Sequence, residues 1–210
     1  MSLLTYTIER DGADRLLFLL HGWSAEQHHL AAYVPLVDPN GHYTAICPRA
    51  PLDLPHGDGA SWYDRVDGQP VESSFLEGLG LVEQLMAEKS ESYGVPLERC
   101  VIGGFSQGGF LAIAAALRAG APRIGGVWAM CCAMPDVGGL ELDLAPGSGD
   151  RRPALVQFGE LDPIMPPERG RAVAAALDHA GWNVTEAGYP MAHTQRIEMM
   201  SDAEAWLAAE

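Results

Sequence analysis

A serine, a carboxylate and a histidine occur along this 210-residue chain in positions where they could form one nucleophilic centre. Ser106 stands in the segment GGFSQGG, which follows a short apolar run and precedes an alanine-rich segment of helical length. In that setting, Gly104-x-Ser106-x-Gly108 is typical of a nucleophile elbow, a tight strand-to-helix turn whose flanking residues must be small. The pattern also permits a plainer interpretation, in which Ser106 only caps the helix N-terminus.

The same glycines do not fit a dinucleotide-binding turn. That motif needs a glycine where Ser106 stands, and an acidic residue about 20 residues further on, at the end of the next strand. The next apolar segment, 124–130, contains no acidic residue. The dinucleotide-binding interpretation is therefore weaker than that of a nucleophile elbow.

A serine hydroxyl needs a general base, and the base needs a group that orients it. Of the seven histidines, His193 is the one that lies between the last predicted strand and the closing helix, after the predicted elbow. Two carboxylates follow the apolar segment ALVQFG, Glu160 and Asp162. Asp162 is preferred because Pro163 restricts the backbone before it. Glu160 remains the alternative, and Asp136 is a weaker third.

The order Ser106, Asp162, His193 is the chain order of α/β-hydrolase triads. An acyl-transfer site also needs hydrogen-bond donors for the oxyanion. The backbone N–H groups of Gln107, directly after the serine, and Trp23, in the turn after LLHG, are the expected pair. His21 is expected to pack and form hydrogen bonds beneath that turn.

Short apolar segments alternate with segments of helical character. Strands are predicted at 3–8, 15–20, 43–47, 100–102, 124–130, 154–158 and 183–187, and helices at 25–34, 75–91, after the elbow, at 168–180 and at 196–208. This alternation predicts an α/β fold, with a mostly parallel central sheet and helices on both faces. In such sheets ligands bind beyond the carboxyl ends of the strands. One domain, 1–210, is expected, with no separate lid domain and a long loop at 48–74.

The charge of the chain excludes some classes of partner. Thirteen basic and 28 acidic residues give a net charge of −15, which disfavours nucleic acids and anionic membranes as partners. No apolar run is long enough for a membrane span, and the first residues lack the pattern of a secretory signal, so a cytoplasmic protein without a membrane anchor is expected. The four cysteines lack metal-site spacing and are expected to be free thiols, and no metal is predicted.

Several motifs together resemble the phospholipase/carboxylesterase family of α/β hydrolases, which includes acyl-protein thioesterases and small bacterial carboxylesterases. They are LFLLHGWS, PRAP followed by GASWYD, GGFSQGG, GELDPIMP and an Ala-His pair near the end. The resemblance covers nearly the whole chain. It implies Ser106 as nucleophile, His193 as base, Asp162 as orienting acid, and Trp23 and Gln107 as oxyanion donors.

The chain departs from the family pattern at a few positions. Ser24 stands where a second glycine is common, Phe158 replaces a frequent histidine, Ala192 replaces a glycine, and CCAM at 131–134 replaces a Ser-Gly pair. None of these changes removes a catalytic group. They bear on the shape of the pocket and on the oxyanion loop.

The expected function is that of a cofactor-independent serine carboxylesterase. Its substrates are expected to be small to medium acyl esters, with thioesters and lysophospholipids left open, as is a homodimer. Trp62, Met134 and Met165 are expected to line the acyl pocket, although Trp62 could instead only anchor its loop. A dienelactone-hydrolase-like lactonase is one alternative, since it shares the fold and the residue order. A non-catalytic binding protein on the same fold is the other.

Overall fold

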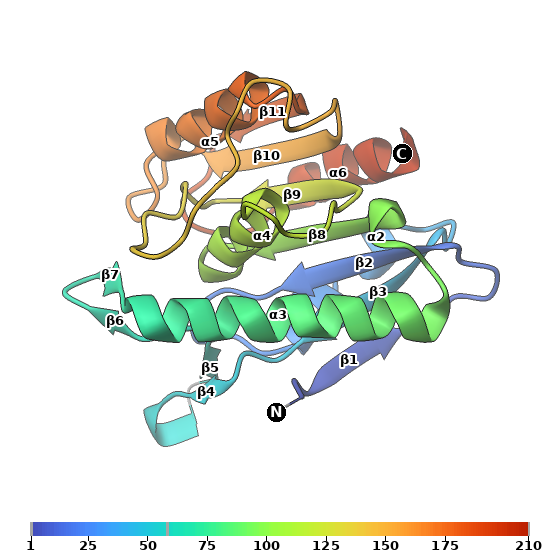
Figure 1. The fold of residues 1–210 in the computed structure, drawn as a ribbon, viewed down its shortest axis with the longest axis horizontal. Helices are drawn as coiled ribbons and strands as arrows, with labels where there is room; N and C mark the ends of the chain where they lie inside the picture. The colour runs from blue at the N-terminus through green and yellow to red at the C-terminus, as the bar shows by residue number, and fades with distance from the viewer. Residues whose placement is uncertain (1, 58, 210) are drawn as a thin grey trace.

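A seven-stranded sheet forms the centre of the protein in a computed structural model, which describes residues 2–57 and 59–209 (Figure 1). The strands lie in the order β1-β3-β2-β8-β9-β10-β11. They comprise β1 Thr5–Ile8, β2 Arg15–Leu20, β3 Tyr43–Pro48, β8 Cys100–Phe105, β9 Gly126–Met130, β10 Pro153–Gly159 and β11 Asn183–Tyr189. Only β1 is antiparallel to its neighbour in this sheet. The predicted mostly parallel sheet is confirmed.

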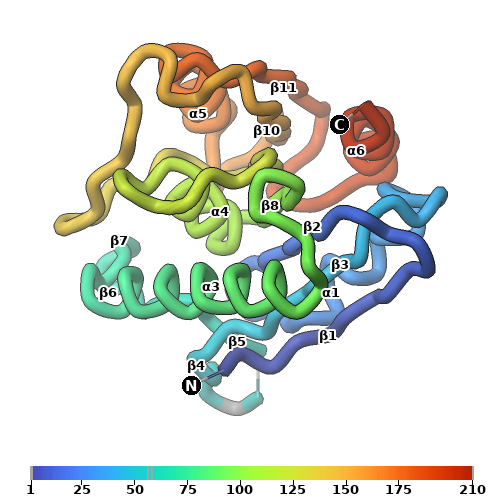
Figure 2. The backbone as a smooth tube through the Cα atoms, turned by 45° about the vertical axis from the view of Figure 1, so that its right-hand side comes forward, coloured from blue at the N-terminus to red at the C-terminus, as the bar shows by residue number. Residues whose placement is uncertain are grey.

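Helices cover both faces of the sheet. One face carries α3 Glu72–Tyr93, α4 Gln107–Leu117 and α5 Pro167–His179, and the other carries α1 His28–Ala31, α2 Val34–Val37 and α6 Ile197–Ala209. In Figure 2, α5 and α6 lie on opposite sides of β10. Each face of the sheet buries its own hydrophobic cluster, so helices cover the central strands on both sides.

The strand β2 shows why the sequence of a central strand is apolar throughout. Leu16, Phe18 and Leu20 belong to the cluster under α3 and α4, whereas Leu17 and Leu19 belong to the cluster under α6. Successive side chains of a strand point to opposite faces. A strand that is covered on both faces must therefore be apolar at every position.

The structure differs from the sequence prediction at the segment 25–34. One helix is predicted there, but two short helices form, α1 and α2, with Ala32 and Tyr33 between them. Pro35 occupies the first turn of α2. Because proline has no backbone N–H, a continuous helix through this position would lose a hydrogen bond, and a new helix begins there instead.

The predicted loop at 48–74 contains more structure than expected. It holds two small ribbons, β4 Leu52–Asp53 with β5 Ala60–Ser61 and β6 Arg65–Val66 with β7 Gln69–Pro70, and a 3-10 turn, η1 Pro55–Gly57. Asp67 and Gly68 join β6 to β7, and both have positive φ, 50° and 81°. That conformation is the one a two-residue Asp-Gly hairpin requires.

All four cysteines are free and buried, as predicted. Cys131 belongs to one hydrophobic cluster and Cys132 to the other, so these neighbours lie on opposite faces of the sheet. Burial raises the pKa of the thiols of Cys47, Cys100 and Cys131 to about 12. These thiols are therefore protonated at neutral pH.

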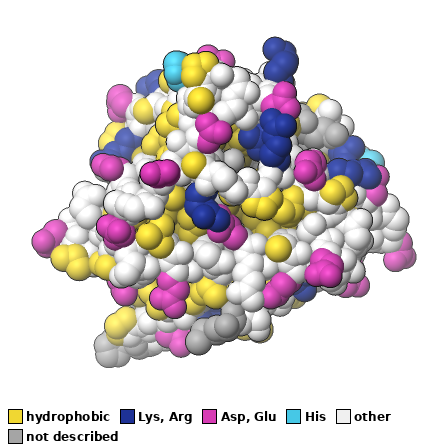
Figure 3. Space-filling model, in the orientation of Figure 1, with side chains coloured by type: hydrophobic (Ala, Val, Ile, Leu, Met, Phe, Trp, Pro, Cys, Tyr) yellow, Lys and Arg dark blue, Asp and Glu magenta, His cyan; other side chains and the backbone are white. Residues whose placement is uncertain are grey.

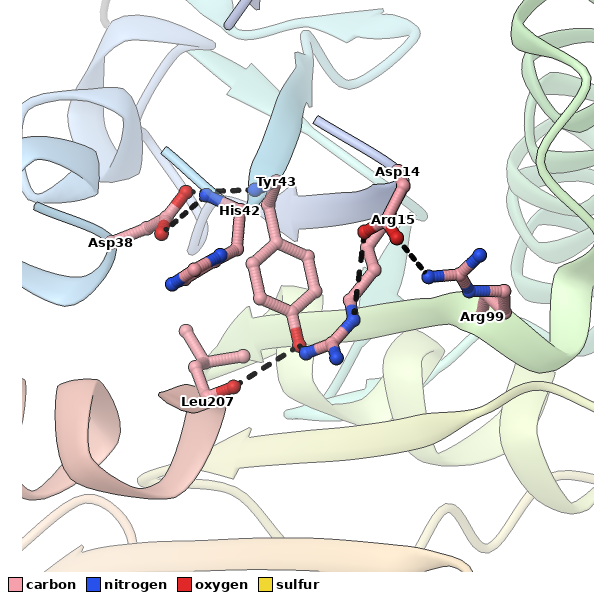
Figure 4. Close-up of polar contacts among 7 residues, drawn as sticks. All are labelled: Asp14, Arg15, Asp38, His42, Tyr43, Arg99 and Leu207. Carbon is pink, nitrogen blue, oxygen red and sulfur yellow. Dashed lines mark hydrogen bonds and ion pairs between the residues drawn. The ribbon is translucent and has the colours of Figure 1, made fainter. Parts of the chain in front are cut away.

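Polar contacts join the N-terminal ends of the central strands, as Figure 4 shows. The Asp38 carboxylate accepts hydrogen bonds from the backbone N–H groups of His42 and Tyr43, each at 2.9 Å. The Tyr43 hydroxyl donates to the Leu207 carbonyl at 3.3 Å. These contacts connect the start of β3 to α6. The site described below lies at the opposite, C-terminal ends of the parallel strands.

The surface carries scattered charge. On the face drawn in Figure 3, acidic side chains are spread over the molecule among fewer basic ones. Within the described residues, no helix has both the length and the apolarity that crossing a bilayer would require.

Candidate active site

Ser106 occupies a sharp turn between β8 and α4. Its backbone has φ 51° and ψ −117°, a conformation that is rare for a residue with a side chain. A Cβ at Gly104 would lie 2.3 Å from the carbonyl carbon of Gly108, and a Cβ at Gly108 would lie 2.2 Å from the Leu20 carbonyl oxygen. The strand and helix backbones are therefore too close here for any side chain. Strain of this kind persists at functional sites when the surrounding structure enforces it.

The hydroxyl of Ser106 contacts a histidine rather than its own helix. Its Oγ lies 2.9 Å from His193 Nε2, and it makes no capping hydrogen bond to α4. The capping interpretation therefore does not describe this serine. His193 follows β11 in the chain, and its side chain is 13% exposed.

The other ring nitrogen of His193 contacts Asp162. Nδ1 lies 2.6 Å from Asp162 Oδ2, and the second oxygen of this carboxylate accepts hydrogen bonds from the backbone N–H groups of Ile164 and Met165, at 2.8 and 2.9 Å. The Asp162 side chain is fully buried. Both carboxylate oxygens are thus occupied, which holds the carboxylate against the ring. An Nδ1–H donated to Asp162 leaves Nε2 free to accept the serine proton.

The three candidate acids, Asp162, Glu160 and Asp136, differ in whether they contact His193. Glu160 forms an exposed ion pair with Arg171 at 2.7 Å, and Asp136 is exposed, with no side-chain hydrogen bond or ion pair among the described residues. Asp162 alone of the three reaches His193. The Asp-Pro pair that favoured it in the sequence lies in the turn that supplies its two backbone donors.

The two expected oxyanion donors, the backbone N–H groups of Trp23 and Gln107, form no hydrogen bond among the described residues. Ser24, which stands where a glycine is common in the family pattern, has φ 62°, and its own N–H donates to the Ala60 carbonyl at 3.0 Å. The turn therefore keeps a conformation that glycine adopts easily, at a cost to serine.

His21 lies beneath this turn, as predicted. It is 1% exposed, its Nδ1 contacts the Gly22 carbonyl at 2.7 Å, and its Nε2 accepts a hydrogen bond from the Ala50 N–H at 3.0 Å. Burial lowers its pKa to about 4. A neutral ring with the proton on Nδ1 satisfies both contacts.

A cavity of about 200 Å³ opens beside Ser106. Met165 lines it, but two other residues expected there do not. Trp62 is fully buried, with its indole N–H donating to the His21 carbonyl at 2.8 Å, and Met134 packs against the hydrophobic core. Tyr63 lines the cavity in place of Trp62. Trp62 and Tyr63 lie in a bend after β5 and belong to the same hydrophobic cluster, so no periodicity in the sequence distinguishes the residue that lines the cavity.

The side chain of Gln107 has a role that the sequence analysis missed. Its Oε1 accepts a hydrogen bond from the Trp62 N–H at 3.0 Å, and its Nε2 donates to Ser61 Oγ and to the Tyr63 carbonyl at 2.9 and 3.1 Å. The residue after Ser106 thereby holds the whole 61–63 segment. Its amide group, which can donate and accept at once, suits a backbone that offers both kinds of partner.

One group of potential metal ligands overlaps this site. Ligand atoms of Cys131, Asp162 and His193 lie within 4.8 Å of one another. The carboxylate and the imidazole are already hydrogen-bonded to each other, and burial keeps the thiol protonated at neutral pH. Since a metal-binding cysteine must be a thiolate, this donor set does not favour a metal.

Solved structures share the fold. A carboxylesterase from Bacillus cereus superposes with a TM-score of 0.83 at 20% identity, over 99% of this chain and 94% of that one. A carboxylesterase from Mesorhizobium loti gives 0.80 at 21% identity, over 94% and 90%. At such identities the likeness shows the fold alone, which is the predicted α/β-hydrolase fold.

Sequence relatives point to the same group of proteins. Acyl-protein thioesterase 1 of Gibberella zeae is 33% identical over 65% of this chain, and acyl-protein thioesterase 1 homolog 1 of Dictyostelium discoideum is 28% identical over 69%. The matches span 60% and 66% of the lengths of these two relatives. The family model for phospholipase/carboxylesterase matches residues 7–210. The chain belongs to the phospholipase/carboxylesterase family.

Proposed function

We propose that this protein is a carboxylic-ester hydrolase that works through Ser106, His193 and Asp162. The observation that carries the proposal is the unbroken line of contacts from Ser106 Oγ through both nitrogens of His193 to the buried Asp162 carboxylate. Membership of the family and the names of the sequence relatives support it.

The geometry supports a two-stage mechanism. Ser106 Oγ attacks the ester carbonyl while His193 Nε2 takes the hydroxyl proton, and the N–H groups of Trp23 and Gln107 stabilise the oxyanion. Collapse of the tetrahedral intermediate breaks the bond to the alcohol, which leaves with the proton from His193. Water then attacks the acyl-enzyme, again with His193 as base, and releases the carboxylic acid. Asp162 keeps the proton on Nδ1 and stabilises the transient imidazolium.

The cavity beside Ser106 supports a small to medium acyl group. Its volume of about 200 Å³ leaves little room for a long chain. Across p-nitrophenyl esters of increasing length, we expect kcat/KM to reach its maximum at short to medium acyl chains. A maximum at long acyl chains, or a preference for long-chain triglycerides over all of these esters, would contradict this choice of substrate.

Thioesters are a second substrate class, favoured by the names of the sequence relatives. The same attack on the carbonyl carbon cleaves either kind of bond. The cysteine nucleophile usual in dienelactone hydrolases has no counterpart at the elbow, where serine stands. A lactone assay tests that alternative, and a non-catalytic binding protein would not react with a fluorophosphonate.

The deciding experiment is the replacement Ser106→Ala. Turnover of p-nitrophenyl butyrate and labelling by a fluorophosphonate should both be lost, and Ser73→Ala on the exposed side of α3 should retain both. Circular dichroism confirms that each variant is folded. Retained turnover in a folded Ser106→Ala protein would refute the proposal.

A further inference from the structure

The cavity beside Ser106 is basic, although the protein as a whole is strongly acidic. Arg65 and Arg169 both line it together with Ser106, and none of its lining residues is acidic. The chain has 28 acidic residues and 13 basic ones. We propose that this cavity selects esters whose acyl portion ends in a carboxylate, bound by Arg65 and Arg169. This inference rests on the hydrolase function proposed above.

Arg65 is held in place at the cavity without losing its charge. It lies in the β6–β7 hairpin, and its Nε and Nη2 donate to the Gly68 carbonyl of the same hairpin, at 3.2 and 2.7 Å. Among the described residues, no carboxylate forms an ion pair with it. The carbonyl orients the guanidinium, and its remaining N–H groups stay available for an anion.

Arg169 reaches the same cavity from the first turn of α5. Its side chain has no hydrogen bond or ion pair within the described part of the chain, whereas Arg171, two residues on, pairs with both oxygens of Glu160 at 2.7 Å. Seven other arginines form ion pairs, namely Arg15, Arg49, Arg99, Arg118, Arg123, Arg171 and Arg196. The two arginines of the cavity thus differ from most of the others in keeping their charge unpaired.

The two cations come from separate parts of the chain to one end of the sheet. In Figure 1, the β6–β7 hairpin and the start of α5 both lie at the end toward which the arrows of β2, β8 and β10 point. Two guanidinium groups, each a planar set of donors, suit a carboxylate better than a neutral group. In a protein of charge −15, such a local cluster of positive charge attracts an anionic substrate to the cavity.

The position of His193 assigns the carboxylate to the acyl side. In the proposed mechanism His193 Nε2 gives its proton to the leaving alcohol, so the alcohol must lie next to His193. His193 does not line the cavity, whereas Gln107, a proposed oxyanion donor, does. The cavity therefore receives the acyl portion. Phe110 and Met165 provide apolar wall for its methylene groups.

The test compares two substrates of equal acyl length, p-nitrophenyl valerate and the p-nitrophenyl monoester of glutaric acid. After subtraction of spontaneous hydrolysis, kcat/KM for the glutarate ester should be about tenfold higher at low ionic strength. The ratio should fall as salt is added, because the arginines are exposed and their charges are screened.

Variants assign the preference to the two arginines. Arg65→Gln and Arg169→Gln should each lower the ratio of the two kcat/KM values severalfold, and Arg169→Lys should keep part of it. A general structural defect would slow both substrates and leave the ratio unchanged. The control is Arg123→Gln, which removes the same charge near the start of β9, and it should keep the full ratio.

Each outcome separates this inference from the function on which it depends. If valerate is hydrolysed at least as fast as the glutarate ester, or if the preference survives in the double Arg65→Gln, Arg169→Gln variant, the carboxylate proposal is wrong while the esterase proposal stands. If 3-carboxyphenyl valerate gains as much over phenyl valerate, the assignment to the acyl side is wrong. If neither p-nitrophenyl ester is cleaved and Ser106 resists a fluorophosphonate, both proposals fail.

Discussion

The side-chain oxygen of Gln107 accepts a hydrogen bond from the backbone N–H of Trp62 at 3.0 Å, and this contact joins the turn at Ser106 to the 61–63 segment. The same side chain donates to the Tyr63 carbonyl on the other side of Trp62. Since Tyr63 lines the cavity beside Ser106, the residue that follows the serine also shapes one wall of the cavity.

The variant Gln107→Ala should lose both stability and activity. It keeps the backbone N–H at position 107 but leaves the buried Trp62 N–H without an acceptor, whereas Ser61 Oγ and the Tyr63 carbonyl keep their mutual hydrogen bond. The expected cost is about 1–3 kcal/mol in the free energy of unfolding. Urea denaturation and ester hydrolysis measure the two effects. Gln84→Ala, at an exposed position of α3, should change the free energy of unfolding by less than about 0.5 kcal/mol. Equal effects of the two variants would contradict this role for Gln107.

Two glycines of α3 should respond in opposite ways to alanine. A Cβ at Gly78 would lie 2.5 Å from the Trp62 carbonyl oxygen, whereas a Cβ at Gly80 meets no atom within 4 Å. We expect Gly78→Ala to lower the free energy of unfolding by about 1–3 kcal/mol or more. Gly80→Ala should raise it by about 0.5–1 kcal/mol, because alanine favours the helix. Chemical denaturation of the pair provides the measurement, and stabilisation by Gly78→Ala would show that α3 does not pack so closely on this loop.

Acidification should destabilise the protein partly through His21. Burial lowers its pKa from 6.5 to about 4. Between pH 6.5 and pH 4, His21 is therefore protonated in the unfolded chain but neutral in the folded protein. The free energy of unfolding is therefore largest above pH 6.5, and falls by about 3 kcal/mol from this group as the pH drops toward 4.

The measurement for His21 is urea denaturation of the wild type and of His21→Asn at several pH values from 7.5 to 4. Taking the difference between the two proteins removes the contribution of other titrating groups. The variant should be less stable at pH 7.5 but lose less stability on acidification. Parallel pH profiles would mean that His21 is readily protonated in the folded state.

Thiol reagents should leave the proposed ester hydrolysis intact. All four cysteines are buried, and burial raises the pKa of Cys47, Cys100 and Cys131 to about 12, so thiolates are scarce at pH 7.5. Iodoacetamide should modify no cysteine in the native protein, by mass spectrometry, and all four in urea. Rapid loss of hydrolysis together with alkylation of one native cysteine would point to a thiol in the mechanism.

Local patterns predicted most strands and helices of this fold and singled out Ser106 and His193 for its candidate site. Apolar runs such as 15–20 indicated central strands because both faces of such strands are covered. The glycines around Ser106 indicated the tight turn because only glycine tolerates that approach of strand and helix. The positions of His193 and Asp162 after predicted strands placed them at one edge of a parallel sheet, where the ends of the strands meet.

Tertiary structure decided what depends on contacts between distant segments. It selected Asp162 over Glu160, because only Asp162 reaches His193 while Glu160 pairs with Arg171. It buried Trp62 and turned Tyr63 toward the cavity, and it brought Arg65 and Arg169 together from segments about a hundred residues apart in the chain. Sequence periodicity reports which face of an element is buried. It does not report which side chains from other elements meet there, because that depends on how the whole chain packs.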